Sequence, residues 1–600
     1  MDVEKLRDSL WRPTVALPQL FAGSQALEAP GALAGWTGSV QRLAVVSSLT
    51  ADFIAKAVAC AVFREGIFPQ LYTGLYGAYV QEVLDHSSGL HAFNPDAVVL
   101  ALDWRDVFSE LPIGAPDADA AAAVASKSDR ILALIAQLER RGYTIYAHTV
   151  APPAPSYRGL AERTAAASPQ RQVSAANERL FAHTQGRVHW IDVEALAQRT
   201  GLERWSPERL YLNGRLPFDP RFLPAYMRLF GGAWRAANAR AKKVLAIDLD
   251  NTLWGGVVGD DGVENIALGP DSPAGEAYAR FGAYVKALGE RGVALAVCSK
   301  NDPQVAASAF AHPHAALRVE DFAAFECSWD DKVTGLRRIA AALNLGIDSF
   351  VFADDNPAEC ALVRAELPEV GVVELAGDPA GFVDALEAER WFDAERYTSE
   401  DLQRGRSYAA RRLVEAERAG AVNMEAFLAS LEMQGELFQA AEADLARIAQ
   451  LEQKTNQFNL TTRRYDDAAV RAFAARGDAV VLGFRLRDRH ADHGLVSSLI
   501  AIREGETLRV DSWLMSCRVF SRTAERFVMA GLLELARERG ARTIIGEYLP
   551  TAKNGVVARL YADLGFTARD GEGCRWELDV AAAPVYETPI AGAQSVDAAR

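Results

Sequence analysis

The chain has 600 residues and an ordinary globular composition, 50% apolar and 24% charged, so at roughly 150 residues per domain we expect three or four domains. Its formal net charge of −15 argues against a nucleic-acid partner, because phosphate backbones are bound by clustered Lys and Arg. No stretch approaches the ~20 apolar residues of a membrane span and the first residues lack a signal-peptide pattern, so we expect a cytoplasmic protein without a membrane partner.

Four short β-rich runs alternate with helical stretches in the first part of the chain. The runs are 42–48, 96–104, 143–150 and 188–196. Such alternation is typical of a parallel sheet that is covered by helices on both faces. We therefore predict a first α/β domain at residues 1–238.

Three further runs, each ending in polar residues, predict a second domain at residues 239–392. They are 242–250, 293–300 and 348–355. In an open α/β sheet, ligands bind outside the carboxyl ends of the strands. We therefore expect these three strand ends to meet at one site.

Four carboxylates fall at two of these strand ends. Asp248 and Asp250 follow the first strand, and Asp354 and Asp355 end the third. Four carboxylates cannot share a dry pocket without a counter-charge. Mg²⁺ resolves the repulsion, because it takes carboxylate oxygens and keeps waters for a substrate phosphate. The sequence therefore predicts a magnesium site made by these four aspartates.

The same positions suit phosphoryl transfer. Asp248 is placed to attack phosphorus and form an aspartyl-phosphate, and Asp250 is placed to act as general acid and base. Ser299 and Lys332 can donate hydrogen bonds to the phosphoryl oxygens. An isolated "DLDNT" is also typical of a strand-end turn, since Asp, Asn and Thr bond to local backbone. The motifs "CSKND", "WDDK" and "FADDNP", which follow in order, favour the catalytic interpretation.

The last part of the chain begins with a charged segment, which we predict to be a helical connector at residues 393–434. A domain at 435–582 follows, with three successive strand patterns, a helical run closed by Gly540, and a further strand. Residues 583–600 are rich in small side chains and are expected to be disordered. The whole chain is thus predicted to be an α/β protein with three domains.

The ordered motifs of the second domain resemble the haloacid dehalogenase (HAD) superfamily of phosphotransferases. The string from Ala246 to Gly262, with "KTNQFNLTTRRY" and "WLMSCRV" downstream, looks like the FkbH-like branch (subfamily IIIC). Members of that branch divert 1,3-bisphosphoglycerate into polyketide-type biosynthesis as glyceryl–carrier protein thioesters. The resemblance, from about Lys242 to Phe566, implies a glyceryl transferase/phosphatase with Mg²⁺, a small-molecule acyl phosphate as substrate and an acyl carrier protein as partner.

The resemblance also implies roles for individual residues. Asp248 would be the nucleophile and a metal ligand, and Asp250 the acid/base that binds the metal through its backbone carbonyl. Asp354 and Asp355 would complete the magnesium site. Substrate contacts would come from Thr252, Ser299, Lys300, Asn301 and Lys332. A short Gly-rich segment, 254–262, replaces any large cap and would leave the site open to a bulky carrier.

Acyl transfer also calls for a thiol, because a cysteine can take an acyl group and pass it on by thioester exchange. Cys298, next to Ser299, and Cys517, beside two arginines, are the catalytic candidates, with Cys327 third. Strand alternation points Cys298 away from Ser299, and a buried core cysteine is an equally good interpretation of that position.

The two flanking domains resemble other families. The first is similar to SGNH-type hydrolases, with "VVSSLTADF" at the nucleophile position and no Asp-x-x-His near its end, so we interpret it as a degenerate domain for docking or structure. The third is similar to GNAT acyltransferases. Ser521 and Thr523 replace the glycines of that family, which favours the phosphopantetheine arm of a carrier over coenzyme A. His490 and His493 are either a base or ligands, or solvated residues of a surface loop.

Two alternative functions follow from the same residues. One is a HAD-type phosphatase that acts on another phosphorylated metabolite. The other is a non-catalytic protein that recruits a carrier. The intact set of Asp248, Asp250, Ser299 and Lys332 favours catalysis over recruitment.

Overall fold

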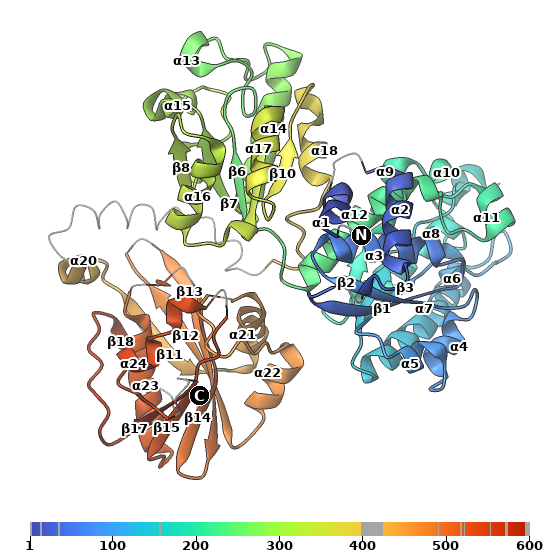
Figure 1. Ribbon diagram of the computed structural model, residues 1–600. Helices are drawn as coiled ribbons and strands as arrows, with labels where there is room; N and C mark the ends of the chain where they lie inside the picture. Colours follow the sequence, from blue (N-terminus) through green and yellow to red (C-terminus); the bar gives the residue numbers. More distant parts are fainter. Residues whose placement is uncertain are drawn as a thin grey trace. The chain divides into compact units, whose positions relative to one another are not determined.

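A computed structural model of the chain shows three β-sheets, each with helices packed against it (Figure 1). The α/β class predicted from the sequence is confirmed. The structure describes residues 3–11, 15–33, 36–154, 158–397, 424–455, 457–489, 491–516, 519–520, 522–551, 554–569 and 574–593. No helix within these ranges is long and apolar enough to cross a membrane. The chain divides into two compact units, residues 1–241 with 387–395, and residues 242–386 with 396–600.

The first unit contains a five-stranded parallel sheet with strand order β2-β1-β3-β4-β5. Its strands are β1 (Val40–Ser47), β2 (Phe68–Thr73), β3 (Ala97–Ala101), β4 (Thr144–His148) and β5 (His189–Ile191). Strand β2 was not predicted. The predicted run 188–196 is a strand only at its start, because Asp192 caps helix α9 (Val193–Thr200) by accepting a hydrogen bond from the backbone N–H of Ala195.

Alternate residues of β1 lie in the two apolar cores of this unit, one on each face of the sheet. Leu43 and Val45 pack with α3 (Asp52–Arg64) and α12 (Leu223–Ala237) on one face. Ala44 and Val46 pack with α7 (Asp117–Arg140) and α8 (Pro169–His183) on the other. This period of two is what a strand buried on both faces requires. The other helices of the unit are α1 (Val3–Leu10), α2 (Leu17–Glu28), α4 (Tyr79–Leu84), α5 (Gly89–Phe93), α6 (Trp104–Val107), α10 (Leu202–Trp205) and α11 (Glu208–Gly214).

Residues 387–395, which we call the return segment, belong to the first unit although they follow the second domain in sequence. Trp391 stacks on Trp11 with ring centroids 4.9 Å apart. Glu389 accepts a charged hydrogen bond of 2.5 Å from the buried Arg64. The predicted domain boundary at 392 is therefore wrong for these residues, because their aromatic and ionic partners lie in the first unit.

The middle sheet is also five-stranded and parallel, with strand order β10-β9-β6-β7-β8. Its strands are β6 (Val244–Ile247), β7 (Ala294–Ser299), β8 (Ala324–Cys327), β9 (Phe350–Asp354) and β10 (Gly371–Glu374). The accompanying helices are α13 (Val258–Asp261), α14 (Pro273–Glu290), α15 (Pro303–Ala309), α16 (Lys332–Leu343), α17 (Pro357–Glu366) and α18 (Phe382–Glu387). This order puts β6 between β9 and β7, so the three predicted strand ends are neighbours at one edge of the sheet.

The third sheet has eight strands in the order β16-β17-β15-β14-β13-β12-β11-β18. The strands are β11 (Gln434–Gln439), β12 (Ala479–Arg487), β13 (Asp492–Glu504), β14 (Thr507–Met515), β15 (Thr543–Glu547), β16 (Thr567–Ala568), β17 (Arg575–Asp579) and β18 (Ala591–Ala593). The helices are α20 (Met424–Ser430), α21 (Glu442–Lys454), α22 (Asp467–Ala474), α23 (Ala524–Glu538) and α24 (Leu560–Asp563). Helix α23 packs in one apolar core, and α21 and α22 pack in the other.

The C-terminal tail departs from the prediction of disorder up to residue 593. Strand β18 pairs in parallel with β11, and Ile590 is 5% exposed within the main apolar core. Tyr586 donates a hydrogen bond of 2.7 Å to the carbonyl of Leu564. Small residues therefore fold here because a sheet edge is available to pair with them. Residues 594–600, and 398–423 of the predicted connector, lie outside the described residues.

Candidate active site

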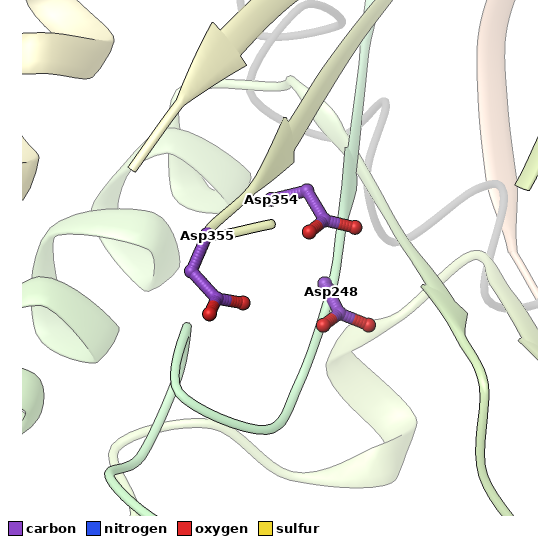
Figure 2. Close-up of side chains that lie close together, drawn as sticks. All are labelled: Asp248, Asp354 and Asp355. Carbon is purple, nitrogen blue, oxygen red and sulfur yellow. The ribbon is translucent and has the colours of Figure 1, made fainter. Parts of the chain in front are cut away.

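Three carboxylates gather at the carboxyl end of the middle sheet. Asp248 directly follows β6, Asp354 is the last residue of the adjacent β9, and Asp355 directly follows that strand. The backbone N–H of Asp248 bonds to the carbonyl of Ala353 at 3.0 Å, which fixes the two strand ends side by side. One oxygen from each carboxylate lies within 4.8 Å of the others, and Figure 2 shows the three groups turned toward a common space.

Lys332 supplies the positive charge that faces these carboxylates. It is the first residue of α16, whose start is capped by Asp331 accepting from the backbone N–H of Thr334. The Lys332 ammonium donates to Asp248, lies 3.1 Å from Oδ2 of Asp354 and donates to the carbonyl of Cys298 at 2.8 Å. Burial by itself would lower the pKa of Lys332, but the two carboxylates outweigh it and raise that pKa, so the lysine is charged at neutral pH.

The carboxylate of Asp354 is left with an unsatisfied acceptor. Its side chain is 1% exposed, and Oδ2 accepts no hydrogen bond from the described residues, because Lys332 approaches it with poor geometry. Burial first, and then the charge of Asp248, raises the pKa of Asp354 to about 6. The single charge of Lys332 offsets only part of the negative charge of three neighbouring carboxylates, and the remaining charge is costly in a buried place unless a further cation offsets it. The donor set of Asp248, Asp354 and Asp355 therefore fits a hard divalent cation.

Asp250 lies outside this group of three and has its own partners. Its Oδ1 accepts from the indole N–H of Trp254 at 2.8 Å and from the backbone N–H of Val258 at 3.0 Å. Its Oδ2 accepts from Asn301 at 2.9 Å. Burial raises the pKa of Asp250, although the donors of Val258 and Trp254 oppose the shift. A carboxyl group with a raised pKa, held in a fixed orientation, is what proton transfer near neutral pH requires.

The loop after Asp250 is a short flap rather than a domain-sized cap. Asn251 has a left-handed φ of 56°, and its side chain accepts from the backbone N–H of Gly256 at 2.9 Å. Gly255 then pairs with Ala267 in an antiparallel bridge. A Cβ at Gly255 would lie 2.8 Å from the ring of Tyr278, so this position must be glycine for the flap to close against the domain.

The predicted substrate-binding residues do not all have the same surroundings in the structure. Some contact the carboxylates of the site, and one is in an ion pair. The hydroxyl of the buried Thr252 donates to Asp355 at 3.2 Å, and Asn301 holds Asp250, so both residues position carboxylates. Ser299 is 4% exposed at the end of β7, next to the carboxylates in strand order. The ammonium of Lys300 is paired with Glu359 at 2.5 Å.

Sequence reasoning missed the two donors from the flap, Trp254 and the backbone of Val258. The spacing of Asp250 and Trp254 by four residues was the available signal, since such a spacing lets a tight turn bring an indole back to the carboxylate. The interpretation of residues 254–262 as a substitute for a cap does not use this spacing.

The cysteines suggested for acyl transfer are buried where the structure describes them. Cys298 is 2% exposed, and its Sγ lies 3.8 Å from the carbonyl of Lys332, on the face of β7 that packs against α16. Burial raises the pKa of Cys298 to about 12 and that of Cys327, 8% exposed, to about 12. Neither thiol forms a nucleophilic thiolate readily in these surroundings. Cys517 lies outside the described residues.

Of the two histidines singled out in the third domain, His490 lies outside the described residues. His493 is 2% exposed, with Nε2 2.8 Å from the carboxylate of Asp488 and 2.9 Å from the guanidinium of Arg522. The interpretation of His493 as a solvated loop residue is therefore wrong. It lies beside the buried ion pair of Asp488 and Arg522.

No protein-family model matches the chain, and no curated protein matches it in sequence. Among solved structures, the N-terminal part of the protein BF1531 from Bacteroides fragilis, which contains a phosphatase domain complexed with Mg, is similar at 25% identity with a TM-score of 0.57. The similarity covers 64% of this chain and 100% of that chain. Two GNAT-type structures each cover 24% of this chain. They are the ribosomal-protein-S18-alanine N-acetyltransferase of Escherichia coli (14% identity, 94% of that chain, TM-score 0.20) and the GNAT domain of S. lividans PAT (18% identity, 90% of that chain, TM-score 0.21).

Proposed function

We propose that the chain is a Mg²⁺-dependent phosphatase whose nucleophile is Asp248 and whose general acid and base is Asp250. The observation that carries the proposal is the grouping of Asp248, Asp354 and Asp355 around a common space beside the charged Lys332. The similarity to a phosphatase domain solved with Mg supports the choice of reaction and of metal.

The reaction takes place in two displacements. A carboxylate oxygen of Asp248 attacks phosphorus, the bond from phosphorus to the leaving oxygen breaks, and Asp250 gives its proton to that oxygen. Asp250, now a carboxylate, takes a proton from a water molecule whose oxygen attacks the aspartyl-phosphate. The bond between phosphorus and Asp248 breaks, releasing inorganic phosphate and regenerating both side chains.

The surroundings of each side chain suit these roles. Asp250 is held by donors from the flap and from Asn301, so its proton is delivered from a fixed direction. Lys332 can shift its hydrogen bond from Asp248 to a phosphoryl oxygen as charge develops there. Asp248, Asp354 and Asp355 would hold Mg²⁺, which when bound offsets the repulsion between these carboxylates and the incoming phosphate.

The finer part of the proposal concerns the substrate. The FkbH-like motifs support 1,3-bisphosphoglycerate as the acyl phosphate, with the glyceryl group passed to the thiol of an acyl carrier protein. In that step a thiolate attacks the acyl carbon, and the bond to the acyl phosphate oxygen breaks to release phosphate. The aspartate site then removes the remaining phosphate. The burial of Cys298 disfavours it as an intermediate carrier of the acyl group, which leaves Cys517 and the carrier's own thiol.

A comparison of two aspartate variants tests the phosphatase. With Mg²⁺ and 1,3-bisphosphoglycerate, Asp248→Asn should release no phosphate from the phosphomonoester position, whereas Asp271→Asn, at an exposed acid of the same domain, should match the native chain. Full activity of Asp248→Asn would show that another residue is the nucleophile.

Intact-protein mass spectrometry tests the acyl step separately. A glyceryl adduct on the enzyme, mapped to Cys517, or on an added carrier protein would support glyceryl transfer. Phosphate release without an adduct on either protein would reduce the function to a plain phosphatase.

A further inference from the structure

Trp329 is the one tryptophan among the described residues whose side chain is exposed. It is 78% exposed, whereas the other tryptophans are buried or half-buried. Within the described part of the chain, its indole N–H donates to no group and its ring stacks on no other ring. A single exposed apolar residue is ordinary on a protein surface, so the position of Trp329 decides how it is interpreted.

The loop that carries Trp329 joins β8 to α16 at the carboxyl end of the middle sheet. Directly before Trp329, the backbone N–H of Ser328 donates to the carbonyl of Ser299, the last residue of β7, at 3.1 Å. Three residues after Trp329, Lys332 donates to Asp248. The loop is therefore held to the active site on both sides of the indole, while the indole itself takes no part in holding it.

The flap is anchored to the same strand end. Asp250 accepts from the backbone N–H of Val258 in the flap and from Asn301, the second residue after β7. Helix α13 of the flap contacts α15, which follows β7 in the chain (Figure 1). Val257, the flap residue directly before Val258, is 39% exposed. The flap and the Trp329 loop thus meet at the end of β7.

The leaving group of the proposed reaction starts at this place. Asp250 gives its proton to the leaving oxygen, so that oxygen lies beside Asp250 during the reaction. The organic part of the substrate extends from the oxygen away from phosphorus, which is bound by Asp248 and Lys332. It therefore passes the end of β7, where Val257 and Trp329 are exposed. An indole is large and rigid, so it covers a chain of several atoms at a low cost in entropy.

The charges around the site disfavour a leaving group that carries a further negative charge. The segments from β6 to α14, β7 to α15, β8 to α16 and β9 to α17 contain one basic residue, Lys300, which is paired with Glu359 at 2.5 Å. Arg338, in α16, already pairs with Asp330 and Glu326. The exposed acids of these segments are Asp260, Asp261, Glu264, Asp271, Asp302, Asp330 and Asp331. A second anionic group on a substrate would therefore meet mainly negative charge.

We propose that Trp329 contacts the leaving group of the substrate, and that the site selects phosphomonoesters whose organic part is uncharged and extended. This inference rests on the phosphatase activity proposed above and adds the residue that distinguishes between substrates. The phosphate of a glyceryl thioester belongs to this class, whereas that of free phosphoglycerate does not.

Steady-state kinetics of the full chain with Mg²⁺ and two alkyl phosphates tests the contact. Hexyl phosphate and ethyl phosphate have the same reacting group and differ only in chain length. The kcat/KM for hexyl phosphate should exceed that for ethyl phosphate by about 10-fold, because part of the longer chain leaves water against the indole. Equal values would overturn the proposal and leave the phosphatase intact. Hydrolysis of neither ester would contradict the phosphatase and, with it, this inference.

Variants of Trp329 test the residue. Trp329→Ala should lower kcat/KM for hexyl phosphate by about 10-fold, through a higher KM, and lower that for ethyl phosphate by less. Trp329→Phe should retain most of the preference for the longer chain. Leu362→Ala is the matched control, because Leu362 is also exposed but lies in α17, away from both loops. An unchanged preference in Trp329→Ala would overturn the role of the indole.

A matched pair of substrates tests the selection by charge. 3-Phosphoglycerate and its amide have nearly the same shape, but only the acid has a negative charge on its leaving group. The native chain should have a higher kcat/KM for the amide, and the difference should shrink at high salt, because exposed charges are screened. A higher kcat/KM for the acid would show that a cation binds its carboxylate, and would overturn the selection of uncharged leaving groups.

Discussion

Replacing Lys332 with methionine removes the charge that holds the carboxylates of the middle sheet together. The ammonium is 4% exposed, donates to Asp248 and lies 3.1 Å from Asp354. In Lys332→Met, two buried carboxylates face each other without a counter-charge when no metal is present. The domain should therefore be less stable, and its stability should depend strongly on Mg²⁺.

The size of the effect follows from the burial of these groups. Breaking a buried pair costs about 3–5 kcal/mol, which for a domain of this size lowers its unfolding temperature by about 10 °C. Burial and Asp248 already raise the pKa of Asp354 above its unfolded value, and the loss of Lys332 raises it further. The folded state then binds more protons than the unfolded state, so the stability of the metal-free variant falls as pH rises from about 4 toward neutrality.

Scanning calorimetry of the full chain measures the stability of the variant. The transition of the middle domain is the one whose temperature changes when Mg²⁺ is added. Without Mg²⁺, Lys332→Met should have a lower unfolding temperature than the native chain at pH 7.5, and this difference should shrink at pH 5. Addition of Mg²⁺ should raise the unfolding temperature of Lys332→Met by more than it raises that of the native chain. Lys286→Met is the control, because within the described part of the chain Lys286 donates to the carbonyl of Ala316 and to no carboxylate. An unchanged transition in metal-free Lys332→Met would refute the argument that this lysine balances the carboxylates.

Three further predictions concern single contacts. Trp254→Phe removes a donor that lowers the pKa of Asp250, so the alkaline limb of the pH profile of kcat/KM should move to higher pH. An alkaline limb at the same pH as in the native chain would contradict the role of the indole. Cys298→Ala should keep phosphatase activity and any glyceryl adduct while losing about 1 kcal/mol of stability in urea unfolding; loss of the adduct would show that the buried thiol reacts. Ile590→Ala should destabilise the third sheet by about 2–5 kcal/mol in the same assay, and a smaller loss would mean that the tail adds little to the core.

The sequence could predict where the carboxylates gather because that depends on local patterns. Apolar runs that end in Asp248 and Asp354 mark strand ends, and parallel strands put such ends at one edge. The contact of Asn301 with Asp250 could not be predicted in the same way. It depends on the path of the loop after β7, which no pattern in "SKND" specifies.

Other differences come from tertiary context. Strand β2 contains "FPQLYT", which lacks a clear alternation, and it forms because β1 offers an open edge. Strand β18 has only small residues and pairs because β11 lies beside it. The resemblance predicts that Thr252 contacts the substrate, but the left-handed turn at Asn251 directs its hydroxyl to Asp355. In each case the partner, rather than the residue's own propensity, decides the outcome.

The return segment makes the first unit discontinuous along the gene. A protease that cuts within residues 242–386 would leave two fragments of the first unit without a covalent link, joined by the indole stack of Trp11 on Trp391 and the ion pair of Arg64 with Glu389. A gene fragment that ends before Glu387 would encode a first unit with Trp11 uncovered and Arg64 deprived of its carboxylate. Expression of this unit alone therefore calls for a splice that joins residue 241 to 387, or for residues 387–395 supplied as a separate peptide.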